Sequence, residues 1–329
     1  MTHPLRDTCN VAIIGSGPAG LATANTLQDA GHDCLIFEAG CLAQNLMRFP
    51  THMEFFSTAN LIELRGFPLV CPRGNPTRRE YLAYLARYAR DRHLKVRLHE
   101  PVEMIEAADE GFVVHSRRPA DGATCRTRAR RVVIAIGAYA QPAPLGCPGE
   151  ELDKVSHYYT EAHPYVGSRV LVVGNGNSAV EAALELCAAS VEVTMAVRSE
   201  GFGHVKYWIQ PAIENRIREG IVPAHFSTAV EAIGRESVTL RPADGEPFDI
   251  GNDFVLALTG YEPDVTLLRR CGVEVDDATK RPHYDPETLE TNVPGLFVAG
   301  VIAAGNISAE IFIENSRYHG EKILKGISG

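Results

Sequence analysis

The sequence of 329 residues has little of what membrane, secreted or nucleic-acid-binding proteins need. No apolar run approaches the roughly 18 residues that span a bilayer. Residues 1–10 are polar and lack the apolar core of a secretory signal, so we expect a cytoplasmic location and no membrane partner. With 32 Lys and Arg against 41 Asp and Glu, the formal net charge of −9 also argues against nucleic acid as a partner.

The usual patterns of metal and dithiol chemistry are also missing. The cysteines are scattered and form no Cys-x-x-Cys, so neither a zinc ribbon nor a local redox dithiol is indicated. The twelve histidines add no metal-ligand constellation, and we expect no metal site. Free cysteines of this kind are commonly reduced, buried and inert. The eight are Cys9, Cys34, Cys41, Cys71, Cys125, Cys147, Cys187 and Cys271.

What the sequence does contain is a complete dinucleotide-binding pattern near its start. Residues 11–20 read Val-Ala-Ile-Ile-Gly-Ser-Gly-Pro-Ala-Gly, an apolar run that enters a Gly-x-Gly-x-x-Gly turn. A helical stretch follows, and a second apolar strand closes with Glu38 at the spacing of a ribose ligand. Gly15 allows the tight turn, Gly17 lets the backbone approach a pyrophosphate, and Gly20 lets helix and strand pack closely. The pyrophosphate would sit at the helix N-terminus, where free N–H groups favour negative charge.

The pattern occurs a second time. An apolar strand over 169–173 runs into Gly-Asn-Gly-Asn-Ser-Ala at 174–179, followed by a helical stretch over 180–188 and a strand over 191–197. Ala179 replaces the third glycine, which the pattern tolerates because alanine still permits close packing. Two dinucleotide sites imply two dinucleotides and electron transfer between them.

The order of the remaining pieces predicts how the domains are connected. Apolar strands that end in glycine occur before and after the second pattern, and the Pro-containing stretch 140–144 is typical of an interdomain connection. We therefore expect an α/β fold of two Rossmann-like, three-layer domains, the second inserted in the first. Residues 1–140 and 261–329 would form the first domain, and residues 141–260 the second.

Three local expectations can be checked directly. Thr77 and Glu80 form a capping box that starts a helix. The charged run 126–131 predicts a solvated edge. The irregular segment 49–58, with its phenylalanines, is expected to be an ordered loop covering a ligand rather than an ordinary surface loop.

The order of pieces resembles the flavoprotein family with two dinucleotide domains that includes thioredoxin reductase. The resemblance rests on the two glycine patterns at 15–20 and 174–179, called fingerprints from here on, and on the apolar strand that ends at Gly137. It also rests on Thr-Gly-Tyr-x-Pro-Asp at 259–264 and on Pro-Gly-Leu-Phe-Val-Ala-Gly at 294–300. The resemblance covers nearly the whole chain. It implies FAD in the first domain, with Glu38 on the FAD ribose, and NADPH in the second, with residues 174–179 at its pyrophosphate.

Several segments resemble more narrowly the bacillithiol disulfide reductase-like proteins, which are thought to use FAD and NADPH to reduce the disulfide of a low-molecular-weight thiol. Ala19 stands where bacillithiol-type members carry a cysteine, just before the third glycine. Val301 stands where the thioredoxin-reductase pattern has an aspartate at the FAD ribityl chain, and it fits the narrower family. The segments are 50–53, 55–58, 76–79, 205–209, 214–217, 304–306 and 311–315.

The motifs and the resemblance together give a set of residues expected to bind the cofactors. Arg198 follows the strand after the second fingerprint, where an NAD site would carry an acid, so it favours the 2′-phosphate of NADPH, with Lys206 assisting. A last helix capped by Asn306 and Ser308 could stabilise a reduced flavin by its N-terminus, or the two residues could be caps alone. The set is Gly15, Gly17, Pro18, Ala19, Gly20, Glu38, Ala39, His52, Gly137, Gly174, Gly176, Asn177, Ser178, Ala179, Arg198, Lys206, Gly260, Gly300, Val301 and Asn306.

The expected activity is that of an FAD-dependent NADPH oxidoreductase. It would pass a hydride from NADPH to flavin and on to a small-molecule acceptor, foremost a low-molecular-weight disulfide, without a Cys-x-x-Cys relay. Cys41, in the loop after Glu38, is the candidate catalytic thiol, and an inert packed thiol is the other reading. Two alternatives are a flavin-dependent oxygenase or oxidase acting on a small biosynthetic intermediate, and a non-catalytic dinucleotide sensor, which would need no second site. A homo-oligomer is one of the assembly states left open.

Overall fold

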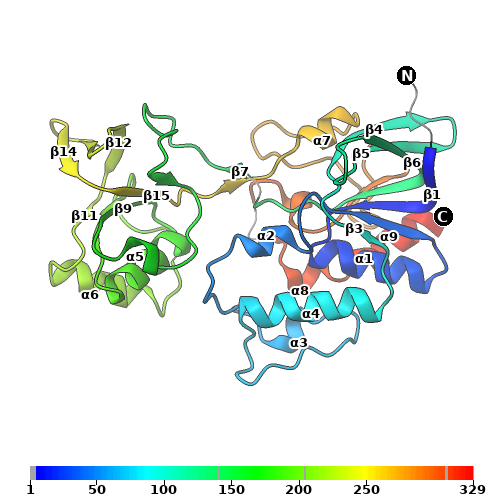
Figure 1. Cartoon of the computed structure of the whole chain (residues 1–329), viewed down its shortest axis with the longest axis horizontal. Coiled ribbons are helices and arrows are strands. Elements are labelled where there is room, and N and C mark those ends of the chain that lie inside the picture. The colour runs from blue at the N-terminus through cyan, green and yellow to red at the C-terminus, as the bar shows by residue number, and fades with distance from the viewer. Residues whose placement is uncertain (1–4, 140, 204, 308–309, 329) are drawn as a thin grey trace. The chain divides into compact units, whose positions relative to one another are not determined.

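The computed structural model describes residues 5–139, 141–203, 205–307 and 310–328 and divides the chain into two compact units (Figure 1). Unit 2 contains Pro142–Tyr261 together with the short segment Arg48–Thr51. Its main segment is therefore inserted in the sequence of unit 1. Residue 140, where we expected the first segment to end, lies outside the described residues. Unit 1 contains Met1–Met47, His52–Gln141 and Glu262–Gly329.

Unit 1 is built on a seven-stranded sheet whose long strand β6 has two different neighbours on one side. Residues 124–129 of β6 pair in antiparallel fashion with β5, whereas residues 132–134 pair in parallel with β17. On its other side β6 runs parallel to β1, and β1 runs parallel to β2. The strands in spatial order are β3 (Val96–Arg97), β2 (Cys34–Phe37), β1 (Leu5–Ile14), β6 (Thr124–Ile134), β5 (Gly111–Arg117) and β4 (Val102–Ala108), with β17 (Leu296–Val298) on β6.

The charged run 126–131 is not a solvated edge, as we expected, but part of β6 inside the sheet. Thr127 and Ala129 are buried, whereas Arg128 and Arg130 are exposed. Successive side chains of a strand point to opposite faces, so a charged residue at every second position leaves the other face apolar. The prediction was wrong because it was based on the number of charged residues and not on their alternation with buried residues along the strand.

Helices cover the sheet on both faces and make unit 1 three-layered (Figure 1). α1 and α9 pack against each other below the sheet, and α7 lies on the other face. The capping box of Thr77 and Glu80 is confirmed at the start of α4, with both reciprocal hydrogen bonds formed. The helices are α1 (Pro18–Asp29), α2 (Gln44–Met47), α3 (Ala59–Ile62), α4 (Arg78–Asp91), α7 (Thr266–Arg270), the 3₁₀ helix η2 (Val301–Ala304), α8 (Ile313–Ser316) and α9 (His319–Ser328).

The expectation that Asn306 caps the last helix is wrong. α8 begins at Ile313, after Phe312, whose N–H donates to the side chain of Asn315 at 2.9 Å. Asn306 instead bonds to the backbone of Thr279, and Ser308 lies outside the described residues. In the segment 49–58, Phe55 packs on Tyr81 whereas Phe56 is exposed. That this segment covers a ligand stays a prediction.

Unit 2 has a five-stranded, all-parallel sheet with α5 on one face and a three-stranded antiparallel sheet on the other. Val170 and Val172 of β9 face one side of the sheet, and Leu171 and Val173 face the other. Both faces are therefore apolar and both are covered. The parallel strands in spatial order are β11 (Ala224–His225), β10 (Glu192–Ala196), β9 (Arg169–Val173), β15 (Phe254–Ala257) and β8 (Val155–Ser156). The other elements are η1 (His163–Tyr165), α5 (Asn177–Ala188), α6 (Gln210–Arg218), β12 (Thr228–Ile233), β13 (Ser237–Pro242) and β14 (Phe248–Gly251).

A short two-stranded sheet of β7 (Gln141–Pro142) and β16 (Tyr261–Glu262) lies where the chain passes from one unit to the other. Each unit has the three-layer α/β architecture expected of a Rossmann-like domain, so the predicted fold class is confirmed. Of the helices that the structure describes, none combines the length and the apolar character needed to cross a membrane.

Candidate functional site: two dinucleotide cradles

The turn between β1 and α1 has the geometry that a bound pyrophosphate requires. Gly15 has a φ of +110°, and a Cβ on it would collide with the carbonyl oxygen of Ala135. A Cβ on Gly20 would collide with the carbonyl oxygen of Gly15, so helix and turn touch closely here. A Cβ on Gly17, in contrast, would meet no atom of the protein within 4 Å. Free space therefore lies beside the N-terminus of α1, where Pro18 is the first residue and the initial N–H groups lack helical partners.

The carboxylate of Glu38 is tied to the same turn. Its Oε2 accepts the backbone N–H and the hydroxyl of Ser16 at 3.0 and 2.8 Å, and its Oε1 accepts the N–H of Gly40 at 3.1 Å. The fully buried Ser16 hydroxyl also accepts the N–H of Ala43 at 3.1 Å. Because an ionised carboxylate has about four acceptor positions, Glu38 keeps one for a ribose hydroxyl. The residue can thus order the loop and hold a nucleotide at once.

Two more glycines lie at the same edge of the sheet. Gly137 has a φ of +75° just after β6, where Asn45 of α2 donates to the carbonyl of Ile136 at 3.0 Å. Gly300 has a φ of +80° just after β17, and a Cβ on it would lie 2.9 Å from the Cβ of Ala19. The carboxyl ends of β1, β6 and β17 therefore meet at the N-terminus of α1, the edge at which open α/β sheets bind ligands. We call this edge, formed by the turn 15–20 with Glu38, Gly137 and Gly300, the first cradle.

The second cradle is the turn 174–179 in unit 2, and its glycines have the same roles as those of the first. Gly174 has a φ of +142°, and a Cβ on it would collide with the carbonyl oxygen of Leu258. A Cβ on Gly176 would again meet nothing within 4 Å, at the N-terminus of α5. Ala179 is fully buried and packs where the third glycine would be. The loop beyond β10 is held to this turn, because Asn177 accepts the N–H of Lys206 at 2.9 Å.

The two basic residues expected near the 2′-phosphate differ in their surroundings. The Arg198 side chain is exposed just after β10 and forms no hydrogen bond or ion pair with the described residues. The ammonium of Lys206 pairs with Glu181 of α5 and lies 5.8 Å from the centre of the Trp208 ring. Arg198 is therefore available to an anion, whereas Lys206 already has an anionic partner.

The thiols of the chain are dispersed. All eight cysteines are free, and burial raises the pKa of Cys9 and Cys34 to about 12 and that of Cys271 to about 11. Such thiols stay protonated and are poor nucleophiles at neutral pH. Cys41 is half-buried, and its thiol lies 3.1 Å from Oε1 of Gln44. Within the described ranges, no three His, Cys, Asp or Glu side chains gather as a metal site would require.

The other residues expected at the cofactors lie on the same two edges or at the surface. Gly260 has a φ of +101° and free space beside it, shortly after β15. Val301 begins η2 directly after Gly300, whereas His52 and Ala39 are exposed. Their roles at a cofactor stay predictions, as does that of Asn306.

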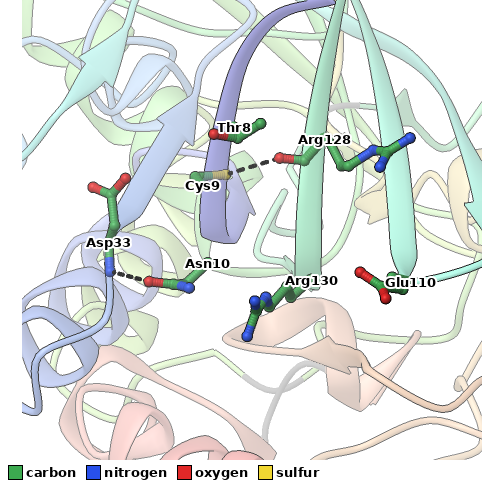
Figure 2. A pocket seen from close by; sticks show the side chains of 7 residues that line it. All are labelled: Thr8, Cys9, Asn10, Asp33, Glu110, Arg128 and Arg130. Carbon is green, nitrogen blue, oxygen red and sulfur yellow. Dashed lines mark hydrogen bonds between the residues drawn. The ribbon is translucent and has the colours of Figure 1, made fainter.

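An open cavity of about 310 Å³ lies elsewhere in unit 1 (Figure 2). Its lining comes from residues 8–10 in the middle of β1, from β6, from Asp33 before β2 and from Glu110 between β4 and β5. None of these residues belongs to the fingerprint. Figure 2 shows Asn10 accepting the N–H of Asp33 and the Cys9 thiol directed at the carbonyl of Arg128, which are structural contacts. We assign no chemistry to this cavity.

Sequence reasoning missed three polar side chains that support the first cradle. Ser16 binds Glu38, Asn45 binds the turn before Gly137, and the buried His319 accepts the N–H of Gly300 at 3.1 Å. Ser16 lies inside the fingerprint, where a hydroxyl could have been noticed. Asn45 and His319 carry no local signal, because their partners lie far away in the sequence.

Comparison with known proteins agrees with this geometry. The family model described as pyridine nucleotide-disulphide oxidoreductase matches residues 12–300. Bacilliredoxin reductase Bdr of Bacillus subtilis is 39% identical over 318 residues, 96% of each chain. The solved structure of bacillithiol disulfide reductase Bdr (YpdA) from Bacillus cereus is 40% identical, with a TM-score of 0.94 over 98% of this chain and 99% of that one. The corresponding structure from Staphylococcus aureus is 33% identical, with a TM-score of 0.91 over 98% of both chains.

These similarities extend over the full length of the chain and include both cradles. The resemblance drawn from the motifs is confirmed, and so are the cofactors that it implied, FAD with NADPH as the reductant. The chain belongs to the pyridine nucleotide-disulphide oxidoreductase family.

Proposed function

We propose that this protein uses NADPH and bound FAD to reduce a low-molecular-weight disulfide. The observation that carries the proposal is the matched pair of cradles. Gly17 in one unit and Gly176 in the other both leave free space at a helix N-terminus. Gly15 and Gly174, which precede them, must be glycine because a Cβ at either position would collide with a backbone carbonyl oxygen. A single-site sensor would not need the second cradle.

The residues of the chain bind and orient the cofactors. FAD, when bound, supplies the hydride acceptance and electron delivery that side chains lack. Glu38 would hold its ribose, the N-terminus of α1 its pyrophosphate, and the Gly300–Val301 backbone would line the same edge. In unit 2 the N-terminus of α5 would hold the NADPH pyrophosphate, and the unpaired guanidinium of Arg198 would hold the 2′-phosphate.

The proposed acceptor follows from the relatives and from the thiols. The B. cereus relative is named for bacillithiol disulfide and the B. subtilis relative for bacilliredoxin. This chain has Ala19 at the fingerprint position and no Cys-x-x-Cys. Cys41 lies only three residues past Glu38, on the side assigned to the adenosine ribose, so it is not placed to pass electrons from the flavin ring. We therefore propose that the acceptor is reduced without a relay through Cys41.

The free cysteines support a reducing compartment for this reaction. Eight thiols without a disulfide are typical of proteins kept in the cytoplasm rather than exported. We propose a cytoplasmic enzyme acting on a small molecule.

One set of experiments on the purified protein tests the proposal. Flavin released by heating should be FAD, and NADPH should bleach the bound flavin under anaerobic conditions. Continued NADPH oxidation should then require a disulfide, screened as bacillithiol disulfide, glutathione disulfide and cystine. FMN or no flavin would contradict the cradle argument. Oxygen uptake equal to NADPH consumption, with no dependence on disulfide, would instead support the oxygenase alternative.

A further inference from the structure

A buried histidine contacts the backbone of the first cradle from behind. His319 is the first residue of α9 and is only 8% exposed. Its Nδ1 accepts the N–H of Gly300 at 3.1 Å, a contact between the start of α9 and the turn after β17. The bond joins the histidine to the turn that carries Gly300, at the edge of the sheet assigned to the cofactor.

The peptide that His319 holds is in a demanding position. Gly300 adopts a φ of +80°, and a Cβ on it would lie 2.9 Å from the Cβ of Ala19 in the first turn of α1. Its N–H is buried, and an unpaired buried N–H is costly. Without an acceptor at the position of Nδ1, we expect the peptide to rotate toward another partner. That rotation would move Val301 and the wall facing α1.

The start of α9, which carries the ring, packs closely on α1. Gly320, the next residue, packs so closely on α1 that a Cβ on it would lie 2.9 Å from the Cα of Thr23 and 2.8 Å from the side chain of Thr26. α9 is thereby fixed to the helix that carries the pyrophosphate cradle. Burial, together with the charge of Lys322, lowers the pKa of His319 to about 4, so the imidazole is neutral and Nδ1 can accept.

We propose that His319 is a positioning residue for FAD, which holds the Gly300–Val301 backbone in the conformation that the cofactor contacts. The inference rests on the proposed function in one respect, that unit 1 binds FAD. It goes beyond that function by giving a role to a side chain that the fingerprints do not include.

Three substitutions separate positioning from plain stability. His319→Asn keeps an acceptor at the place of Nδ1, His319→Gln moves it one bond further, and His319→Leu removes it. Ile323→Ala, at a fully buried position of the same helix, is the matched control for lost packing. Each apoprotein is titrated with FAD, its melting temperature is measured, and the visible circular dichroism of the flavin is recorded at saturation.

We expect His319→Leu to weaken FAD binding by roughly ten- to a hundredfold and to change the visible circular dichroism. His319→Asn should return to within about threefold of the parent protein, and His319→Gln should fall between them. Ile323→Ala should lower the melting temperature and leave FAD affinity nearly unchanged.

The inference is overturned if FAD affinity follows melting temperature alike in His319→Leu and Ile323→Ala, or if His319→Asn gives no recovery. If His319→Leu does not fold, equal affinities of the Asn and Gln variants overturn it. A parent protein that binds no FAD would refute the proposed function, whereas a parent that binds FAD as tightly as His319→Leu would refute only this inference.

Discussion

Ala19 and Gly300 face each other at the first cradle, so closely that a Cβ added to Gly300 would lie 2.9 Å from that of Ala19. One residue belongs to the first turn of α1 and the other to the turn after β17, separated by most of the sequence. The fit explains why a small residue is needed at both places. It also means that the shape of the cradle depends on the C-terminal part of the chain.

Gly300→Ala should therefore damage the cradle more than backbone strain alone predicts. At φ +80° and ψ −164° Gly300 has a backbone conformation that is essentially restricted to glycine, so the substitution adds strain of about 1–3 kcal/mol to a collision with Ala19. Gly31→Ala is the control, because Gly31 has a similar φ of +89° but free space around it. Both variants should melt earlier, and only Gly300→Ala should lose FAD affinity in equilibrium titrations. Equal FAD affinity in the two would show that this contact does not shape the site.

Gly17→Ala should leave the fold intact and weaken FAD binding. Gly17 has a φ of −68°, which alanine adopts freely, and no protein atom lies where its Cβ would go. The apoprotein should stay within about 1 kcal/mol of the parent, because the lower entropy of the unfolded chain is offset by alanine being a poorer N-cap of α1 than glycine. FAD affinity should fall at least about tenfold, or about 1.4 kcal/mol, because the methyl group would occupy the position proposed for the pyrophosphate. Gly176→Ala should do the same for NADPH, and swapped effects would contradict the assignment of the two cradles.

Arg198→Ala should reduce the preference for NADPH over NADH. A charge-assisted pair with the 2′-phosphate contributes roughly 1.5–3 kcal/mol, so the ratio of the two kcat/KM values should fall about ten- to a hundredfold. Arg235→Ala removes another exposed arginine of unit 2, between β12 and β13, and should leave the ratio unchanged. An unchanged ratio in Arg198→Ala would mean that the phosphate binds elsewhere.

Cys41→Ser should preserve both half-reactions. The serine hydroxyl can keep the hydrogen bond to Gln44, and transfer of hydride to the flavin needs no thiol. Anaerobic bleaching by NADPH and disulfide-dependent turnover should both stay within about twofold of the parent, as they should in the control Cys71→Ser. Loss of turnover with normal bleaching would identify Cys41 as a nucleophile and would refute our proposal for the acceptor step.

The stability of the protein should decrease in acid partly because of His319. Its pKa is about 4 in the folded chain against about 6.5 for an ordinary histidine, so the unfolded chain binds the additional proton between these values. The contribution of neutral His319 to the free energy of unfolding is fully present above about pH 6.5. It is lost as the pH falls toward 4, by about 3 kcal/mol in total. Urea unfolding of the apoprotein at pH 7.5 and 4.5 should show a smaller loss for His319→Asn. Identical losses would show that His319 is protonated in the folded state.

The sequence was enough to predict the parts whose physics is local. The glycine spacing at 15–20 and 174–179 predicted two turns at helix N-termini, because tight turns and close packing tolerate few other residues there. The reciprocal bonds of Thr77 and Glu80 were predicted for the same reason, since both partners lie within one helical turn. The family, the fold class and the cofactors followed from the order of these pieces.

Tertiary structure alone decided what depends on partners distant in sequence. The run 126–131 is part of an internal strand because β1 and β5 pair with it on either side. Lys206 forms an ion pair with Glu181 on the neighbouring helix α5. Nothing near Asn306 could reveal that the last helices begin at 313 and 319. His319 meets Gly300 only because α9 packs on α1, so its role could not be read from either segment. Local spacing sets which turns can form, whereas the packing of whole elements sets which side chains support them.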